Sequence, residues 1–303
     1  MSTAWVLAPD FLLIAAGWLL CRFTPLGRSV WDGVERLVYH VLFPVLLFNS
    51  VLRSPLQPAD TLGLAAAGVG VALAGIALAA LLRLWPGADR RLLASGAQTA
   101  FRFNSFIALA LAERLAGAQG LAWIALVIAL CVPLCNVAAV WPLARRGGHG
   151  LARELARNPL IIATLAGLAA NVSGLQLPEI AATTLQRIGL AALPLGLMAV
   201  GAGLKLVGLK EAPALAAALL AIRHVALPLV ALALVALLAL PAGQATIVVM
   251  FAALPTAPSA YVLAVRMGGH GPFVAGLVTV STALCALGVP LWLGAASLLA
   301  APR

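Results

Sequence analysis

The sequence predicts an all-α membrane protein with ten transmembrane helices. Of its 303 residues, 63% are hydrophobic and 9% are charged, and the mean hydropathy is +1.09. Soluble domains carry roughly 25% charged residues. A helix that crosses a bilayer needs about 20 predominantly apolar residues, so the chain has room for about ten such helices. Little of it remains for a soluble domain.

Apolar stretches bounded by proline, glycine and charged residues define the predicted spans. They lie near residues 4–21, 34–53, 61–84, 91–114, 119–142, 158–174, 178–204, 212–240, 243–266 and 272–299. The first of them has no Lys or Arg before its apolar run and no small-residue cleavage pattern after it. We therefore expect a membrane span there and not a signal peptide.

The basic residues of the chain concentrate in the loops that follow odd-numbered spans. Those loops hold Arg22, Arg28, Arg83, Arg90, Arg91, Arg145, Arg146, Arg153, Arg157, Lys205, Lys210 and Arg266. The even-numbered loops hold only Arg53 and Arg114. By the positive-inside rule, the odd loops of this multi-pass protein are cytoplasmic and both termini lie outside. The net charge of +10 thus indicates orientation among membrane lipids and not a nucleic-acid partner.

The chain divides into two repeats of five spans. We expect a first repeat at residues 1–146, a basic cytoplasmic linker at 147–157 and a second repeat at 158–303. At a constant shift of about 154 positions, Asn104-Ser105 corresponds to Pro258-Ser259, and the Ala-Leu-Cys at 129–131 to that at 283–285. An odd number of spans in each half gives the halves opposite orientations, which is an inverted repeat.

Spans four and nine are interrupted near mid-membrane, at residues 98–105 and 254–261. A broken backbone in hydrocarbon is tolerated only where protein buries it or water reaches it, so two breaks predict a cavity between crossing helices. The half-helix N-termini there present N–H groups and partial positive charge to an anion. We expect Asn104 or Ser105 to cap one half-helix and Pro258 to begin the other. Alternatively, the prolines only kink a helix.

The hydroxyl groups of Thr256 and Ser259 are candidate ligands beside the second break, and Arg102 lies within the first. A cation at that depth costs at least ~2.5–3.5 kcal/mol. Since the spans contain almost no carboxylates, we expect Arg102 to pair with carbonyls when the site is empty and with a substrate carboxylate when it is loaded. Alternatively, Arg102 holds the crossing together through carbonyls alone.

Other polar residues lie in predicted spans. Arg223 and His224 of span eight are expected either along the permeation path or in contacts between helices, and His224 is a candidate proton carrier. Asn49 follows a bend at Pro44, where it is able to bond another helix or the substrate. The cysteines are expected to be packing residues, with no disulfide framework, metal site or cofactor. They are Cys21, Cys131, Cys135 and Cys285.

Residues 41–50, 101–106 and 254–264 resemble the bacterial branch of the auxin efflux carrier family, whose members include malate and malonate permeases. The resemblance covers the whole chain. It implies a fold similar to bile-acid/sodium symporters and sodium/proton antiporters, and a homodimer. It also implies a scaffold of spans 1, 2, 6 and 7 and an elevator-type transport domain of spans 3–5 and 8–10. In relatives the first break is richer in Gly, Asn and Thr, whereas here it reads Arg-Phe-Asn-Ser.

The sequence thus predicts a secondary transporter for a small organic anion such as a carboxylate. The candidate substrate-binding residues are Arg102, Asn104, Ser105, Thr256, Pro258, Ser259, Tyr261 and Asn49. The coupling ion, proton or sodium, stays open. A cation/proton antiporter is disfavoured because embedded acids are lacking, and a non-transporting receptor or scaffold because the loops are short. No enzyme is expected, since no nucleophile with a base and no metal-ligand set is present.

Overall fold

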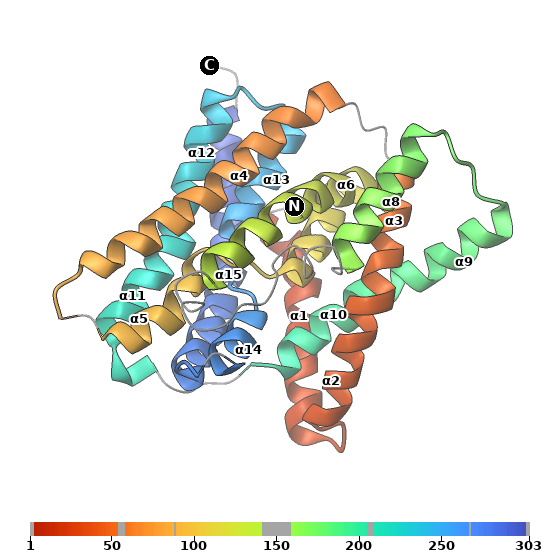
Figure 1. The fold of residues 1–303 in the computed structure, drawn as a ribbon. Coiled ribbons are helices and arrows are strands. Elements are labelled where there is room, and N and C mark those ends of the chain that lie inside the picture. Colours follow the sequence, from red (N-terminus) through yellow and green to blue (C-terminus); the bar gives the residue numbers. More distant parts are fainter. Residues whose placement is uncertain are drawn as a thin grey trace. The chain divides into compact units, whose positions relative to one another are not determined.

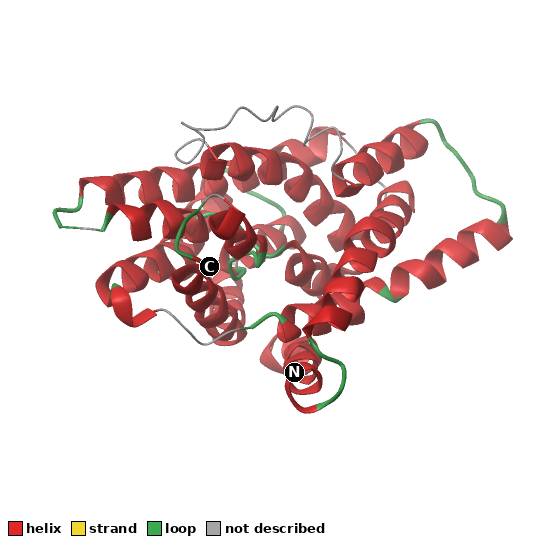
Figure 2. Cartoon of the chain, turned by 60° about the horizontal axis from the view of Figure 1, so that its bottom comes forward, coloured by secondary structure: helices red, strands yellow, loops and turns green. Residues whose placement is uncertain are grey.

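The computed structural model describes residues 3–53, 58–87, 89–140, 159–204, 209–266 and 268–300. In these ranges the regular structure is helical, apart from one isolated bridge between two residues (Figure 2). The predicted linker at 147–157 lies outside the described residues, and so do Arg145, Arg146 and Lys205.

The chain forms two compact units, and the first comprises residues 1–62, 109–129 and 150–203. Its helices are α1 (Thr3–Phe23), α2 (Arg28–Leu37), a π-helical turn (Val38–Leu42), α3 (Phe43–Arg53), α8 (Pro159–Val172), α9 (Glu179–Leu190) and α10 (Ala192–Ala202). Within this unit α3 lies alongside α8, and α1 alongside α10 (Figure 1).

Small residues and a few polar bonds hold the first unit together. A Cβ atom at Gly17 or Gly201 would collide with the backbone of the opposite helix, α10 or α1. Glycine therefore permits the close approach of these two helices, as small residues commonly do in membranes. The side-chain amide of Asn171 donates to the carbonyls of Val51 and Leu52, at 3.0 and 2.8 Å, and so ties α8 to the end of α3.

The second unit comprises residues 63–108, 130–149 and 204–303. Its α-helices are most of α4 (Pro58–Leu81), α5 (Arg90–Gly96), both ends of α6 (Ser105–Val140), α11 (Pro213–Ala221), α12 (Leu227–Leu237), α13 (Ala242–Ala253), α14 (Ser259–Arg266) and α15 (Gly271–Ala300). It also contains 3-10 turns at Leu82–Leu84, Ala97–Ala100 and Leu209–Glu211, and a π-helical turn at Ile222–Ala226.

The helix α6 contains a sharp kink. Ala116 and Gly117 have non-helical backbone angles, and Gly117 has a φ of 54°, which a residue without a Cβ adopts at little cost. The kink falls between the predicted spans at 91–114 and 119–142.

Six helices in the described part of the chain are long and apolar enough to cross a membrane: Arg28–Arg53, Thr61–Leu84, Ser105–Ala139, Glu179–Ala202, Pro213–Leu237 and Gly271–Ser297. This confirms an all-helical, multi-pass membrane protein. The count of ten spans and the inverted repeat stay predictions. Three of the differences have a physical reason. The end of the predicted fourth span and the fifth span form one kinked helix, α6, and the sixth corresponds to a shorter apolar helix, Ile162–Val172. The predicted ninth span is divided between α13 and α14, and α13 has only 12 residues.

The glycine contact between α1 and α10 gives a direct test of the first unit. Gly201→Ala places a methyl group against the backbone of Ile14 and Trp18, so we expect it to destabilise the protein by about 1–3 kcal/mol. Thermal unfolding in detergent measures the effect. The control is Gly33→Ala in α2, where a Cβ meets no atom within 4 Å. An equal response of both variants would contradict the assigned contact.

Candidate functional site

The two breaks predicted from the sequence lie side by side in the second unit. The backbone N–H of Asn104 donates to the Pro255 carbonyl at 2.9 Å, and the N–H of Ala257 donates to the Arg102 carbonyl at 3.4 Å. Between these bonds Phe103 and Thr256 form an isolated antiparallel bridge. We call residues 101–104 and 254–258 together the crossover. Two of its backbone N–H groups thus find acceptors across the breaks, and backbone groups at membrane depth require such partners.

Asn104 sets where the helix after the first break begins. Its side-chain oxygen accepts from the N–H groups of Phe106 and Ile107, at 3.0 and 3.3 Å, which is the N-cap arrangement. Of the two residues that the sequence offered as caps, Asn104 has this role. Its side chain is 2% exposed, and its Nδ2 atom is buried without a hydrogen-bond partner. The crossover therefore contains a spare amide donor at the N-terminus of α6.

Buried polar groups on neighbouring segments hold the second break in place. The Thr256 hydroxyl donates to the Thr99 carbonyl at 2.7 Å, and the Thr256 N–H donates to the Ser281 hydroxyl at 2.9 Å. The Gln98 amide donates to the carbonyls of Ser95 and Ala260, both at 3.2 Å. The bonds of Thr256 connect the crossover with the 3-10 turn at Ala97–Ala100 and with α15, and those of Gln98 connect the same turn with α5 and α14.

Arg223 closes the C-terminal end of α13. Its side chain is 1% exposed, and it donates to the carbonyls of Leu254 and Phe251 at 2.6 and 3.2 Å. The last carbonyls of a helix have no partner within the helix and carry partial negative charge, so a buried cation is stabilised there. For Arg223, the contact between helices is thus the interpretation with direct support. These are the bonds to backbone carbonyls that the alternative interpretation of Arg102 expected for that residue.

His224 stands next to Arg223 on the same π-helical turn. Its Nε2 atom lies 2.8 Å from the Ser281 hydroxyl, the group that also accepts from Thr256. Its Nδ1 atom is buried without a hydrogen-bond partner. Two consecutive residues therefore support the second break, one through carbonyls and one through Ser281. Turns of this kind inside α-helices are frequent at functional sites.

Arg102 lies at the more exposed side of the crossover. Its Nη1 atom donates to the Gln98 side-chain oxygen at 3.2 Å, and its Nη2 atom donates to the Ser259 hydroxyl at 3.0 Å. Ser259 is exposed, and Ser105 and Pro258 are partly exposed. The structure thus brings together residues that the sequence predicted from two distant segments.

The remaining predicted residues lie elsewhere or have other contacts. Tyr261 is partly buried and packs against Ala260, Ala264 and their neighbours on α15. Asn49 belongs to the first unit, on α3; it is buried, and neither side-chain amide atom has a hydrogen-bond partner.

Sequence reasoning did not single out Gln98 or Ser281 as functional. Gln98 was visible as the first polar residue of the break. Ser281 is one of several hydroxyl residues on α15, so the sequence contained no signal for it.

Comparison with known families adds independent evidence. The model of a family described as membrane transport protein matches residues 143–293, about half of the chain, including the second break, Arg223 and Ser281. The chain belongs to this auxin efflux carrier-like family. The family resemblance seen in the sequence is thereby confirmed, and with it the role of a membrane transporter. No curated protein matches the chain.

The role of Arg223 in this transporter can be tested through stability. Arg223→Met removes two charge-assisted bonds, so we expect a loss of about 3 kcal/mol in the free energy of unfolding. The Phe251 carbonyl keeps its bond from the Leu254 N–H in this variant. Faster amide exchange at residues 251–258 should accompany it. Arg187→Met, at an exposed arginine of α9, is the control. An Arg223 variant as stable as this control would show that the bonds are dispensable.

Proposed function

We propose that this membrane transporter carries a small organic anion, such as a carboxylate, across a bacterial inner membrane and binds it at the crossover. One observation carries the proposal. The Asn104 amide, almost fully buried at the start of α6, has a donor without a partner. Such a group is costly unless a ligand accepts from it.

The surroundings of Asn104 favour negative charge. The helices α6 and α14 both begin at the crossover, and helix N-termini attract anions through exposed N–H groups and the helix dipole. Arg102 adds a full positive charge on the same side. An Arg is able to bind a carboxylate through two parallel hydrogen bonds, so we propose that Arg102 exchanges its bond to Ser259 for such a pair.

The other candidate residues receive different parts in this proposal. The hydroxyl groups of Ser105 and Ser259 supply hydrogen bonds to the substrate, and Pro258 and Tyr261 border the site. Thr256 is assigned a structural part, because its hydroxyl is already bonded to Thr99. Asn49 stays a candidate on account of its unsatisfied amide.

The division into two units supports an elevator-type mechanism. The second unit contains the whole crossover, as expected for a domain that moves with its substrate. The first contains α1, α2, α3, α8, α9 and α10, which correspond to the scaffold spans 1, 2, 6 and 7. Residues 109–129 group with the first unit, although the resemblance assigns spans 4 and 5 to the transport domain. The homodimer belongs to the same proposal.

The coupling ion is proposed to be a proton or sodium. In the described residues, none of the observed hydrogen bonds of the crossover involves an Asp or Glu side chain. This favours an anion over a cation at the crossover, and no observation favours the cation/proton antiporter. His224 is the titratable candidate, since it reaches the crossover through Ser281.

Replacing Arg102 tests the anion assignment. Arg102→Ala removes the charge that pairs with the carboxylate. Since the proposed pair of bonds replaces the existing bond to Ser259, the net gain is about one charge-assisted bond, and we expect binding to weaken about 10–100-fold. Thermal-shift and isothermal titration against mono- and dicarboxylates measure the affinity. Arg22→Ala removes the same charge from the first unit and is the control. Unchanged affinity of Arg102→Ala for every carboxylate that binds the unsubstituted protein would rule out the assignment.

Asn104 permits a sharper test, because its cap and its spare donor reside on different atoms. Asn104→Ser keeps a capping oxygen and removes the Nδ2 donor, so we expect stability to change by only a few tenths of a kcal/mol. Substrate affinity should fall about 10-fold. Asn104→Asp keeps the cap but adds a negative charge, and its affinity should fall further. If both variants bind the anion as tightly as the unsubstituted protein, the donor plays no part.

A further inference from the structure

A small pocket lies within the second unit, beside the crossover but distinct from its exposed side. Its volume is about 50 Å³. A single water needs about 10–15 Å³ by a comparable measure, and sites for drug-sized ligands measure about 300–1,000 Å³. The pocket therefore has room for a few waters or one small ion, and not for a dicarboxylate. It is lined by Ile76, Ala79, Ala80, Arg83, Ala94, Ala97, Gln98, Phe101, Ala138 and Ala139.

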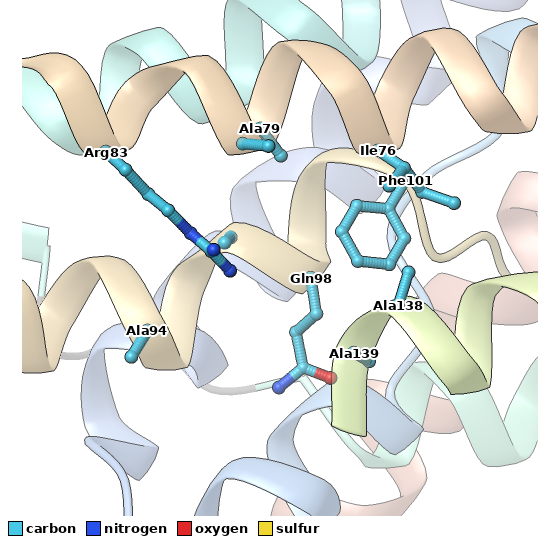
Figure 3. A pocket seen from close by; sticks show the side chains of 10 residues that line it. Ile76, Ala79, Arg83, Ala94, Gln98, Phe101, Ala138 and Ala139 are labelled. Atoms are coloured by element: carbon cyan, nitrogen blue, oxygen red, sulfur yellow. The ribbon is translucent and has the colours of Figure 1, made fainter. Parts of the chain in front are cut away.

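Three elements form the pocket: the end of α4, the segment from α5 to the first break, and the end of α6. Six of its ten lining residues are alanine, so short side chains leave the space open. Arg83 is the charged member of the lining, and no lining residue is acidic. Figure 3 shows the Arg83 side chain reaching from the 3-10 turn that follows α4 toward α5. An exposed guanidinium at the edge of an alanine-lined pocket suits an anion.

The pocket adjoins the crossover through two residues. Phe101 is the first residue of the first break and lines the pocket with its ring. Gln98 also lines it, while the side-chain oxygen of Gln98 accepts from Arg102. An anion in the pocket would thus lie one side chain away from the Arg102 guanidinium.

We propose that this pocket is a second anion site, separate from the crossover, which takes a small anion the size of chloride or formate. Arg83 supplies its positive charge, and the alanines limit its size. Larger carboxylates are excluded from the pocket by volume and bind only at the crossover. The two sites therefore differ in the size of anion that they accept. This assignment does not depend on which substrate the crossover carries.

Cysteine labelling tests the second site without requiring transport. Ala97→Cys, in a Cys21→Ser background, places a thiol in the lining, while Cys131, Cys135 and Cys285 are buried. We expect bromoacetate, a two-carbon monocarboxylate smaller than malate, to alkylate residue 97 several-fold faster than its neutral isostere bromoacetamide, relative to their rates with free cysteine. Chloride and formate should slow the labelling, and malate should not. Mass spectrometry of the purified protein measures the rates.

Two variants separate this proposal from its alternatives. Adding Arg83→Gln should abolish both the preference for the anionic reagent and the protection by chloride, whereas Arg90→Gln, an exposed charge that does not line the pocket, should preserve them. Arg102→Ala should also preserve the protection, so failure of the crossover site and failure of this one are distinguishable. Absence of protection by chloride and formate, or protection that survives Arg83→Gln, would overturn the proposal.

Discussion

The structure depends on one constraint: two helices are broken in a region that is too apolar for bare backbone groups. Hydrocarbon offers no partners to N–H and C=O groups, so each group of the breaks requires a partner from the protein. The two breaks meet this need partly through each other, since Asn104 bonds Pro255 and Ala257 bonds Arg102. The other partners of these backbone groups are side chains that pack against the crossover. The Thr256 hydroxyl donates to the Thr99 carbonyl, the Ser281 hydroxyl accepts from the Thr256 N–H, and Arg223 donates to the carbonyls that end α13.

The same constraint accounts for the charge of the site. The side chain that donates to the carbonyls at the end of α13 is a cation, so a positive charge is buried together with the break. At the beginnings of α6 and α14 the helix dipoles also present their positive ends. The side chains bonded to the crossover in the described residues add no carboxylate to offset them. An anion that binds from solution would neutralise this positive charge. The groups that stabilise the broken helices therefore also favour the proposed substrate.

Much of this arrangement was predictable from the sequence, because breaks are marked by particular residues. Pro255, Pro258 and Asn104 interrupt apolar runs, and their positions located both breaks and the cap. The residues that bond to the breaks were harder to predict from the sequence. Arg223 and Ser281 lie far along the chain from the groups that they bond, and nothing in their local pattern shows which helix they face. A π-helical turn at Ile222–Ala226 alters the direction of Arg223 and His224, and periodicity does not reveal it. The Thr256 hydroxyl was a candidate ligand because it lies beside the second break. Its bond to Thr99 joins residues 157 positions apart, and the sequence does not reveal such a pair.

Arg102 lies in the crossover and Arg223 bonds it from another helix, and the two arginines differ in a way that suits a transporter. Arg223 is sealed in the interior and bonded to carbonyls, so displacing it would leave charged and polar groups without partners at a cost of several kcal/mol. Arg102 is partly exposed and bonds two side chains, Gln98 and Ser259. Its partners can be exchanged at little net cost, because a ligand carboxylate replaces one hydrogen bond by a stronger one. A carrier must release what it binds, so affinity has to stay moderate. The native bond to Ser259 competes with the ligand for Arg102 and thereby limits the gain from binding. Arg223 thus maintains the structure of the site, and Arg102 allows the substrate to bind and dissociate.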